Sequence, residues 1–236
     1  MISDFSTRSD RLELMDEPGL ELAEIEEALA HLDRVNRFTR GYAASVRGVA
    51  ELFEGRKGVR TVLDVGVGGG DTARRLVDWG QSHDIALSVK GIDLSQPAID
   101  YARRLSTHNP WITLETNDLF DLSGEESFDV VHAALMLHHL SDQQAAQALA
   151  KMYALSRLGV VVNDLHRHWL AYAASHVLLP ALSGNRLIRH DGPLSVLRAF
   201  TRQELLGLVA RAGLPRPRIR WHAPFRWLVV IAKERS

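Results

Sequence analysis

The chain contains no cysteine, no apolar stretch long enough to cross a membrane and no excess of charge of either sign. The first absence excludes disulfides, thiolate metal sites and cysteine nucleophiles. A membrane-spanning helix needs about 20 consecutive apolar residues. The formal net charge of −1 argues against a general nucleic-acid binder. Residues 1–5 are mixed and acidic, with no apolar signal region. We therefore expect a cytoplasmic enzyme whose partner is a small molecule, with no nucleic acid and no membrane span.

The length and apolar content fit one α/β domain. The 236 residues, of which 46% are hydrophobic, suffice for a single core with a small lid. Apolar residues recur at helical spacing before residue 60, and strand-like and helix-like segments alternate from there to about residue 162. We divide the chain into an N-terminal helical cap (1–58), a cofactor-binding core (59–164), a lid insertion (165–200) and a C-terminal helix and hairpin (201–236). The cap either only packs on the core or also covers the binding cleft.

The most informative segment is a strand that runs into a glycine-rich turn over residues 62–71. Glycine takes positive φ angles and lets a ligand approach the backbone closely. The helical pattern that starts at Thr72 offers free N–H groups. A dinucleotide fingerprint, G-x-G-x-x-G/A, fits only weakly from Gly68 to Ala73 and leaves Asp64 without a role. The segment therefore predicts a nucleotide cradle of another kind.

An acid and three glycines alternate here as Asp64, Gly66, Gly68 and Gly70. This spacing resembles motif I of the class I S-adenosylmethionine-dependent methyltransferases, in which the acid and the glycines line the methionine end of the cofactor. The resemblance implies S-adenosylmethionine as cofactor and S-adenosylhomocysteine as product. The alternative is an ordinary glycine-rich turn between strand and helix.

A second acid, Asp93, ends the apolar strand expected at Leu87–Ile92. An acid at the tip of the second strand can accept both ribose hydroxyls of a nucleotide. The resemblance implies that Asp93 binds the ribose and that Leu94 lies against the adenine.

The third expected strand, Ile112–Thr116, is followed by Asn117, Asp118 and Leu119. In the family, an Asp at this place and the apolar residue after it contact the adenine amine and ring. We assign these three residues, and Ala134 at the end of the fourth strand, to the cofactor. For Asp118 the alternative is a simple turn residue.

Two histidines, His138 and His139, follow the fourth strand (128–134) and precede Ser141 and Asp142, one of which should cap the next helix. The segment resembles one in phenolic O-methyltransferases that supplies the catalytic base, and alignment on Ser141 places that base at His138. An imidazole with a pKa near 6.5 can take a phenolic proton near neutral pH. His139 is a second candidate, and the alternative is that both histidines only pack.

Polar residues also follow the fifth strand, Leu158–Asn163. Because ligands bind beyond the carboxyl ends of parallel strands, His166 is a rival candidate for the base. Arg167 either steers an anionic group of the substrate or pairs with Asp164. Trp169 is the first residue of the apolar helix in the lid insertion.

The lid insertion begins with an apolar helix over Trp169–Leu179 that should end near Pro180, followed by a polar turn at Arg189–Ser195. Such a helix either covers an apolar substrate or packs against the core. The polar stretch resembles segments of methyltransferases encoded beside polyketide synthases, which act on phenolic lipids and aromatic polyketides. We expect substrate contacts from Arg167, Trp169, His190 and Asp191.

The tail completes the fold. Thr201 opens a capping box, and residues 218–222 and 225–232 read as two closing strands. We therefore predict a Rossmann-like, doubly wound, seven-stranded sheet that is mostly parallel with an antiparallel C-terminal edge hairpin. A typical NAD-binding domain lacks that hairpin.

The prediction for function is O-methylation of a small phenolic, polyketide-like molecule of secondary metabolism by direct displacement. No metal is expected, because the acids are assigned to the cofactor. Three alternatives stay open: C-methylation of a quinone-like ring, an NAD(P)-dependent oxidoreductase, and a cofactor-binding protein without catalysis. The oligomeric state is also open, with a homodimer as one option.

Overall fold

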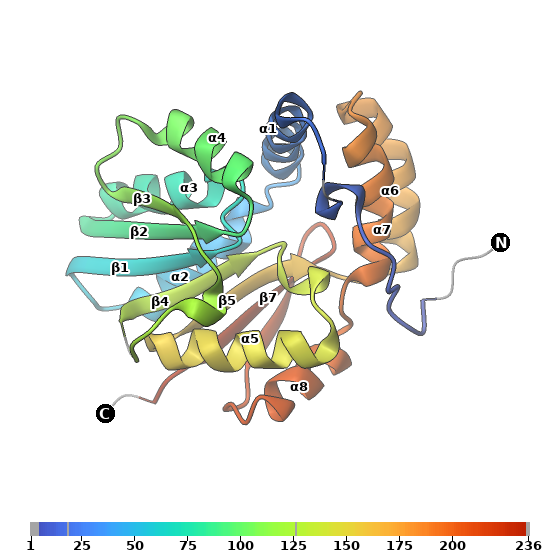
Figure 1. Cartoon of the computed structure of the whole chain (residues 1–236). Helices are drawn as coiled ribbons and strands as arrows, with labels where there is room; N and C mark the ends of the chain where they lie inside the picture. The colour runs from blue at the N-terminus through green and yellow to red at the C-terminus, as the bar shows by residue number, and fades with distance from the viewer. Residues whose placement is uncertain (1–4, 18, 126, 235–236) are drawn as a thin grey trace.

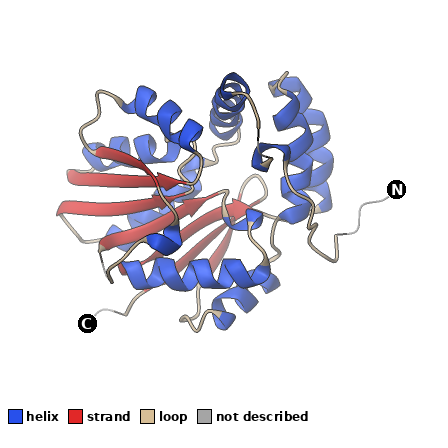
Figure 2. Ribbon diagram, viewed as in Figure 1, coloured by secondary structure: helices blue, strands red, loops and turns tan. Residues whose placement is uncertain are grey.

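The computed structural model describes residues 5–17, 19–125 and 127–234. Its centre is a seven-stranded sheet in the order β3-β2-β1-β4-β5-β7-β6 (Figures 1 and 2). The strands are β1 (Gly58–Val65), β2 (Ile85–Asp93), β3 (Ile112–Thr116), β4 (Phe128–Ala134), β5 (Ser156–Leu165), β6 (Arg218–His222) and β7 (Arg226–Ala232). Strands β1 to β5 pair in parallel, and β7 pairs antiparallel with both β5 and β6. The predicted fold class is confirmed, with β6 at the outer edge.

Helices cover both faces of the sheet. They are α1 (Leu22–Phe38), α2 (Tyr42–Phe53), α3 (Asp71–Ser82), α4 (Gln96–Ser106), α5 (Asp142–Leu155), α6 (Trp169–Leu182), α7 (Arg186–Arg198) and α8 (Arg202–Arg211), with short 3-10 helices η1 (Leu14–Asp16), η2 (Leu119–Asp121) and η3 (Leu137–His139). Among the described residues, no helix has the length and apolar character to cross a membrane.

The sheet separates two apolar cores because successive side chains of a strand point to opposite faces. Leu63 packs with residues of α5 and α8, whereas its neighbour Val62 packs with residues of α2, α3 and α4. A third, smaller cluster joins α1 to α7 through Ala28, Leu187 and Ile188. In Figure 1, α1, α6 and α7 lie beyond the end of the sheet toward which the parallel strands point. This is the end at which such sheets bind ligands.

The helix starts predicted from sequence are confirmed where hydroxyl side chains cap them. Ser95 accepts a hydrogen bond from the backbone N–H of Ala98 at the start of α4. Ser141 and Thr201 each form a complete capping box, with Gln144 and Glu204 respectively. Each cap satisfies N–H groups that have no partner inside the helix.

The expected turn at Arg189–Ser195 is wrong, because this segment lies inside α7. The Asn185 side chain caps that helix by accepting from the N–H groups of Leu187 and Ile188. Gly192 fits tightly against α6, where an added Cβ would lie 1.9 Å from Leu179 Cδ1. Helix α6 likewise continues through Pro180 to Leu182. Packing between the two helices thus overrides the turn preference of glycine and proline.

Candidate active site

The glycine turn at the end of β1 has the positive φ angles expected of the predicted cradle. Gly66, Gly68 and Gly70 have φ angles of +67°, +51° and +75°, a region that costs other residues about 1–2 kcal/mol. A Cβ on Gly66 would also lie 2.8 Å from Met136 Cγ, in the segment that follows β4. The backbone N–H of Gly66 donates to the carbonyl of Ile92 on the neighbouring strand. The turn is therefore held open, close to the segment that carries His138.

Asp93 connects this cradle to the tip of β2. One carboxylate oxygen accepts from the N–H of Gly68 and the other from the N–H of Ser95, each at 2.9 Å. Burial raises the pKa of Asp93, and these two hydrogen bonds oppose the shift. Each oxygen of an ionised carboxylate accepts more than one hydrogen bond. Asp93 is thus fixed in orientation and keeps capacity for two ribose hydroxyls.

Asp64 lies deeper, near the end of β1, and is 1% exposed. One of its oxygens is 2.7 Å from Nδ1 of His132, whose Nε2 lies 2.9 Å from the hydroxyl of Ser45. The other oxygen, Oδ2, is buried without a hydrogen-bond partner. An orphaned buried acceptor is uncommon in native proteins. It fits the amino group of the methionine end of S-adenosylmethionine.

His132 is a site residue that the sequence analysis missed. It lies directly opposite Asp64 in the parallel pairing of β1 with β4. In the sequence it lies in a mostly apolar strand, and its pairing with Asp64 becomes visible only in the register of β1 and β4, which are far apart in the chain.

The residues assigned to the adenine side lie at the ends of β2 and β3. Leu94 is 73% exposed, next to Asp93. Asp118 caps η2 by accepting from the N–H of Phe120. Leu119 belongs to the apolar core, whereas Phe120 is 47% exposed. After β3, Phe120 is thus exposed where Leu119 is buried, and it was not among the predicted residues.

Two further predicted cofactor residues mark the ends of strands. The N–H of Asn117 donates to the carbonyl of Asp93 at 3.1 Å, which holds the β3 end against the β2 end. Ala134 is the last residue of β4 and is half-buried. The strand ends expected to bind the cofactor thus lie along one edge of the sheet.

His138 is buried in η3 and is held by Asp164 from the end of β5. Its Nδ1 lies 2.6 Å from one carboxylate oxygen of Asp164, and its backbone N–H donates to the other oxygen at 3.1 Å. Burial would raise the pKa of Asp164, but the charge and hydrogen bond of His138, with the backbone N–H of Leu165 and the charge of His139, together hold it below the usual value. A carboxylate that accepts a hydrogen bond from Nδ1 favours the tautomer with the proton on Nδ1, in which Nε2 is free to accept a proton.

His139 faces the N-terminal segment. Its Nδ1 lies 3.0 Å from a carboxylate oxygen of Asp16. Burial lowers the pKa of His139, but the hydrogen bond to Asp16 and the charges of Glu13 and Asp16 together raise it above the usual value. His138 and His139 are adjacent rings, with centroids 4.4 Å apart.

His166 has a different environment. Its ring packs against Trp227, with centroids 4.5 Å apart, and its Nδ1 is buried without a partner. Burial, followed by the charges of His168 and Arg167, lowers the pKa of His166 to about 4. Among the described residues no carboxylate is paired with it, so the structure favours His138 over His166 as an oriented base.

Two of the four predicted substrate contacts are engaged inside the protein. Arg167 donates to the carbonyls of Phe5 and Ala199 and pairs with Glu204 at 2.6 Å. Its side chain is 1% exposed, and the suggested pairing with Asp164 is replaced by the one with Glu204. Asp191 accepts from the N–H groups of Leu14 and Met15. Their side chains hold segments of the chain together, so we no longer assign them to substrate.

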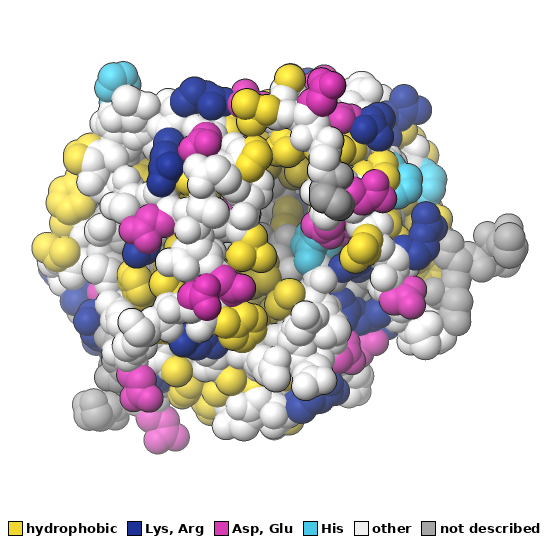
Figure 3. All heavy atoms as spheres, in the orientation of Figure 1, with side chains coloured by type: hydrophobic (Ala, Val, Ile, Leu, Met, Phe, Trp, Pro, Cys, Tyr) yellow, Lys and Arg dark blue, Asp and Glu magenta, His cyan; other side chains and the backbone are white. Residues whose placement is uncertain are grey.

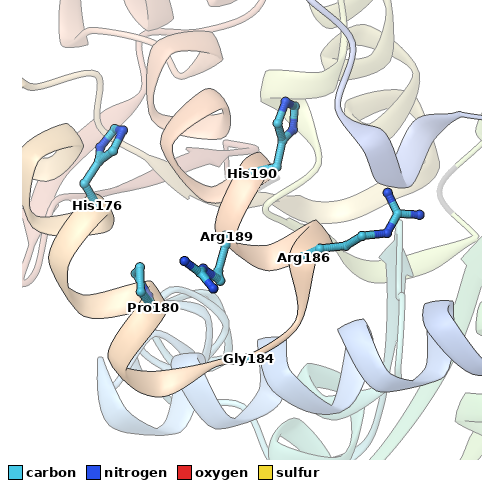
Figure 4. Close-up of a pocket in the computed structure, with 6 residues that line it drawn as sticks. All are labelled: His176, Pro180, Gly184, Arg186, Arg189 and His190. Atoms are coloured by element: carbon cyan, nitrogen blue, oxygen red, sulfur yellow. The ribbon is translucent and has the colours of Figure 1, made fainter.

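The other two predicted contacts lie on the outer lid. Trp169 is 59% exposed at the start of α6. His190 lines a surface pocket of about 470 Å³ between α6 and α7 (Figure 4). The lining residues are His176, Pro180, Gly184, Arg186, Arg189 and His190. No residue of the glycine cradle takes part, so this pocket is separate from the cofactor site.

Comparisons with known proteins agree with this geometry. Residues 62–159 match the family model described as "Methyltransferase domain". An uncharacterized methyltransferase of Anoxybacillus flavithermus is 28% identical over 54% of the chain and 63% of its own length. A putative methyltransferase of Geobacillus is 27% identical over 54% of the chain and 50% of its own length. The match thus spans less than two thirds of either relative.

Solved methyltransferases share the fold of nearly the whole chain. A SAM-dependent methyltransferase from Aquifex aeolicus has a TM-score of 0.62 and 16% identity, over 91% of this chain and 99% of that one. The plantazolicin methyltransferase BpumL has a TM-score of 0.68 and 17% identity, over 88% of this chain and 89% of that one. Human N-acetylserotonin methyltransferase has a TM-score of 0.64 and 14% identity, over 90% of this chain and 56% of that one. Residues 62–159 therefore resemble a methyltransferase domain, the chain shares the fold of these solved methyltransferases, and the comparisons support S-adenosylmethionine as the cofactor.

Proposed function

We propose that the protein transfers the methyl group of S-adenosylmethionine to an oxygen of a small phenolic molecule, with His138 as the proton acceptor. The observation that carries the proposal is the buried pair of Asp164 and His138 at the carboxyl end of the sheet. Met136, two residues before His138, lies against Gly66 of the cradle. The oriented imidazole and the cofactor site therefore share one end of the sheet.

The cofactor would be held at two points. Asp93 would accept the ribose hydroxyls, and the unpartnered oxygen of Asp64 would accept the amino group of the methionine end. Fixing both ends presents the sulfonium methyl in a single direction, and fixed geometry of two reactants is worth several orders of magnitude in rate. The acceptor oxygen attacks this methyl in line and leaves S-adenosylhomocysteine.

The proton of the acceptor would pass to Nε2 of His138. Asp164 holds the proton on Nδ1 and stabilises the imidazolium that forms, as the carboxylate does in a Ser-His-Asp triad. The nearest carboxylate oxygen to Nε2 is Oε1 of Glu13 at 3.6 Å, which is beyond hydrogen-bonding distance. Nε2 therefore keeps its lone pair for the acceptor.

An apolar, aromatic acceptor suits the lid. Helix α6 exposes Trp169, Leu170, Val177 and Leu178, and Phe5 packs edge-on against Tyr172. Apolar and aromatic walls with a few polar groups are typical of sites for small organic ligands. The polyketide-like phenol is inferred from these exposed apolar side chains and from the resemblance of the lid segment.

A methyl-transfer assay tests the proposal. The protein is incubated with methyl-labelled S-adenosylmethionine and a panel of phenols and hydroxyquinones, and products are located by mass spectrometry and NMR. We expect label on a phenolic oxygen and a loss of about 10²–10⁴-fold in kcat for His138→Gln. His166→Gln is the matched control and should keep most of the activity. Label on a ring carbon, or full activity of His138→Gln, would contradict the proposed reaction or the proposed base.

A further inference from the structure

We propose that Glu13, His138 and His139 form a binding site for one divalent transition-metal ion of the zinc type. Each residue offers one ligand atom, and the three atoms lie within 4.8 Å of one another. Nε2 of His138 is 3.6 Å from Oε1 of Glu13, and Nε2 of His139 is 3.9 Å from Oε2. Two imidazoles and one carboxylate are a common ligand set for catalytic zinc.

The outer partners of the two histidines are those of metal ligands. Nδ1 of His138 is bound to Asp164 and Nδ1 of His139 to Asp16. Metal-binding histidines almost always give their second ring nitrogen to a carboxylate, a carbonyl or water, which fixes ring orientation. Here both rings are fixed in this way, and both turn Nε2 toward the same carboxylate.

The distances match an ion better than direct hydrogen bonds. With metal–ligand bonds of about 2.0–2.2 Å in tetrahedral geometry, ligand atoms lie about 3.3–3.5 Å apart. The separations of 3.6 and 3.9 Å exceed this by a few tenths of an ångström, and they are too long for hydrogen bonds. Two of the three pairs are therefore close to the spacing around an ion, and all three ligand atoms lie within 4.8 Å of one another.

The charge balance also suits a dication. Three carboxylates surround the rings, from Glu13, Asp16 and Asp164. Arg198 is the cation nearest Glu13, with Nε 3.7 Å from Oε1, and its guanidinium also donates to backbone carbonyls of residues 138 and 139. Arg8 and Arg226 act on Asp164, whereas Glu13 and Asp16 together carry more negative charge than Arg198 neutralises.

The site has an opening. Glu13 is 4% exposed, but the side chain of His139 is 30% exposed. Figure 3 shows histidine and acidic side chains at the edge of a hollow in this face of the molecule. Three protein ligands with one open position is the arrangement of a catalytic rather than a structural zinc site.

The sequence analysis expected no metal, because it assigned the acids at the strand ends to the cofactor. Glu13 is 125 residues away from His138 in the chain, and only the fold brings the N-terminal segment over η3. Arg8 holds that segment in place by donating to the carbonyls of His138, Leu140 and Arg198.

The inference goes beyond the proposed function, in which His138 is the base of the metal-free protein, and rests on that proposal only for the acceptor. A bound ion would make Nε2 of His138 a ligand instead of a base. A phenol on the open position would then lose its proton to solvent, because a metal ion lowers the pKa of a bound hydroxyl. The oxygen so formed gains the methyl group, and the sulfonium becomes a neutral thioether.

Metal binding is tested on the full chain without S-adenosylmethionine. The protein is treated with chelator, dialysed, and titrated with Co²⁺ under visible absorption, then with Zn²⁺ in competition. We expect one equivalent of Co²⁺ with the absorption of a four- or five-coordinate ion. Glu13→Gln and His139→Gln should each weaken binding by more than tenfold, and Asp16→Asn by about tenfold. His190→Gln is the matched control, since His190 is also bound to a carboxylate, Asp191, outside the cluster.

Two results would overturn the inference: no saturable Co²⁺ binding by a folded wild-type protein, or binding that Glu13→Gln and His139→Gln leave unchanged. Circular dichroism melting of each variant shows whether it is folded. Methyl transfer is measured separately, with and without chelator. If the protein binds Co²⁺ and also transfers methyl groups in the presence of chelator, the metal site is supported but is not needed for methyl transfer. If it binds Co²⁺ but transfers no methyl group, the proposed function is contradicted and the metal site is not.

Discussion

Asp164 forms two hydrogen bonds with His138, one to the imidazole Nδ1 at 2.6 Å and one from the backbone N–H at 3.1 Å. Asp164 lies near the end of β5 and His138 lies in η3, which follows the neighbouring strand β4, so the parallel pairing of β4 with β5 brings the two segments together. The carboxylate is completely buried and has its pKa lowered by the histidine despite burial. This pairing gives the segment after β4 a fixed chemical orientation.

Asp164→Asn should keep the fold and lower methyl transfer. An amide cannot stabilise an imidazolium and allows the wrong tautomer, so we expect kcat to fall by about 10²–10⁴-fold. The dissociation constant for S-adenosylhomocysteine should change little, because the cradle lies on β1 and β2. Steady-state kinetics and calorimetry measure the two quantities. A variant that loses cofactor affinity but keeps kcat would show that Asp164 serves the cradle instead.

Gly66→Ala should weaken cofactor binding, because φ is +67° and the new Cβ would lie 2.8 Å from Met136 Cγ. Gly55→Ala is the matched control: φ is +73°, and nothing lies within 4 Å of its added Cβ. Both variants should lose about 1–2 kcal/mol of unfolding free energy from the backbone alone. Only Gly66→Ala should lose further stability and at least tenfold in affinity for S-adenosylhomocysteine. Equal behaviour of the pair in urea unfolding and calorimetry would count against the cradle geometry.

Arg167→Met should destabilise the fold. The change removes donors to the carbonyls of Phe5 and Ala199 and leaves Glu204 without its cation. We expect a loss of about 2–4 kcal/mol in the free energy of unfolding. Arg157→Met, which breaks a half-exposed pair with Asp129, should cost less than about 1 kcal/mol. Urea unfolding distinguishes them. A stable Arg167→Met protein with a raised KM would restore the role in substrate binding.

His166 should make stability depend on pH between about 4 and 6.5. Burial and neighbouring positive charge lower its folded pKa to about 4, below the unfolded value near 6.5. The unfolded state therefore takes up the proton first, and the contribution of His166 is present above pH 6.5 and lost as the pH falls toward 4. The unfolding free energy of wild type should fall more steeply over this window than that of His166→Gln. Parallel curves in urea titrations at several pH values would disprove the lowered pKa.

The sheet could be predicted from local patterns. Strands β3, β4 and β6 begin and end where the alternation of side chains indicated, and the caps at Ser141 and Thr201 follow from short-range chemistry. Helix α7 could not be predicted in the same way, since Gly192 serves its contact with Leu179 and not a turn.

The candidate site was predictable only where one segment contains it. The glycine cradle and Asp93 follow a strand-end pattern that is visible in sequence. The pairing of Asp64 with His132, of Asp164 with His138 and of Glu13 with both histidines depends on contacts between distant segments. The same holds for Arg167, whose partners lie at residues 5, 199 and 204.

The central claim is that this cradle binds S-adenosylmethionine through Asp93. The most direct measurement is calorimetric titration of the wild-type protein and Asp93→Ala with S-adenosylmethionine, S-adenosylhomocysteine and NADH. Loss of hydrogen bonds to a charged group should weaken both sulfur ligands by about 10–100-fold in the variant, with no binding of NADH to either protein. Binding of NADH in place of the sulfur ligands, or equal affinity of the two proteins for S-adenosylhomocysteine, would contradict the account.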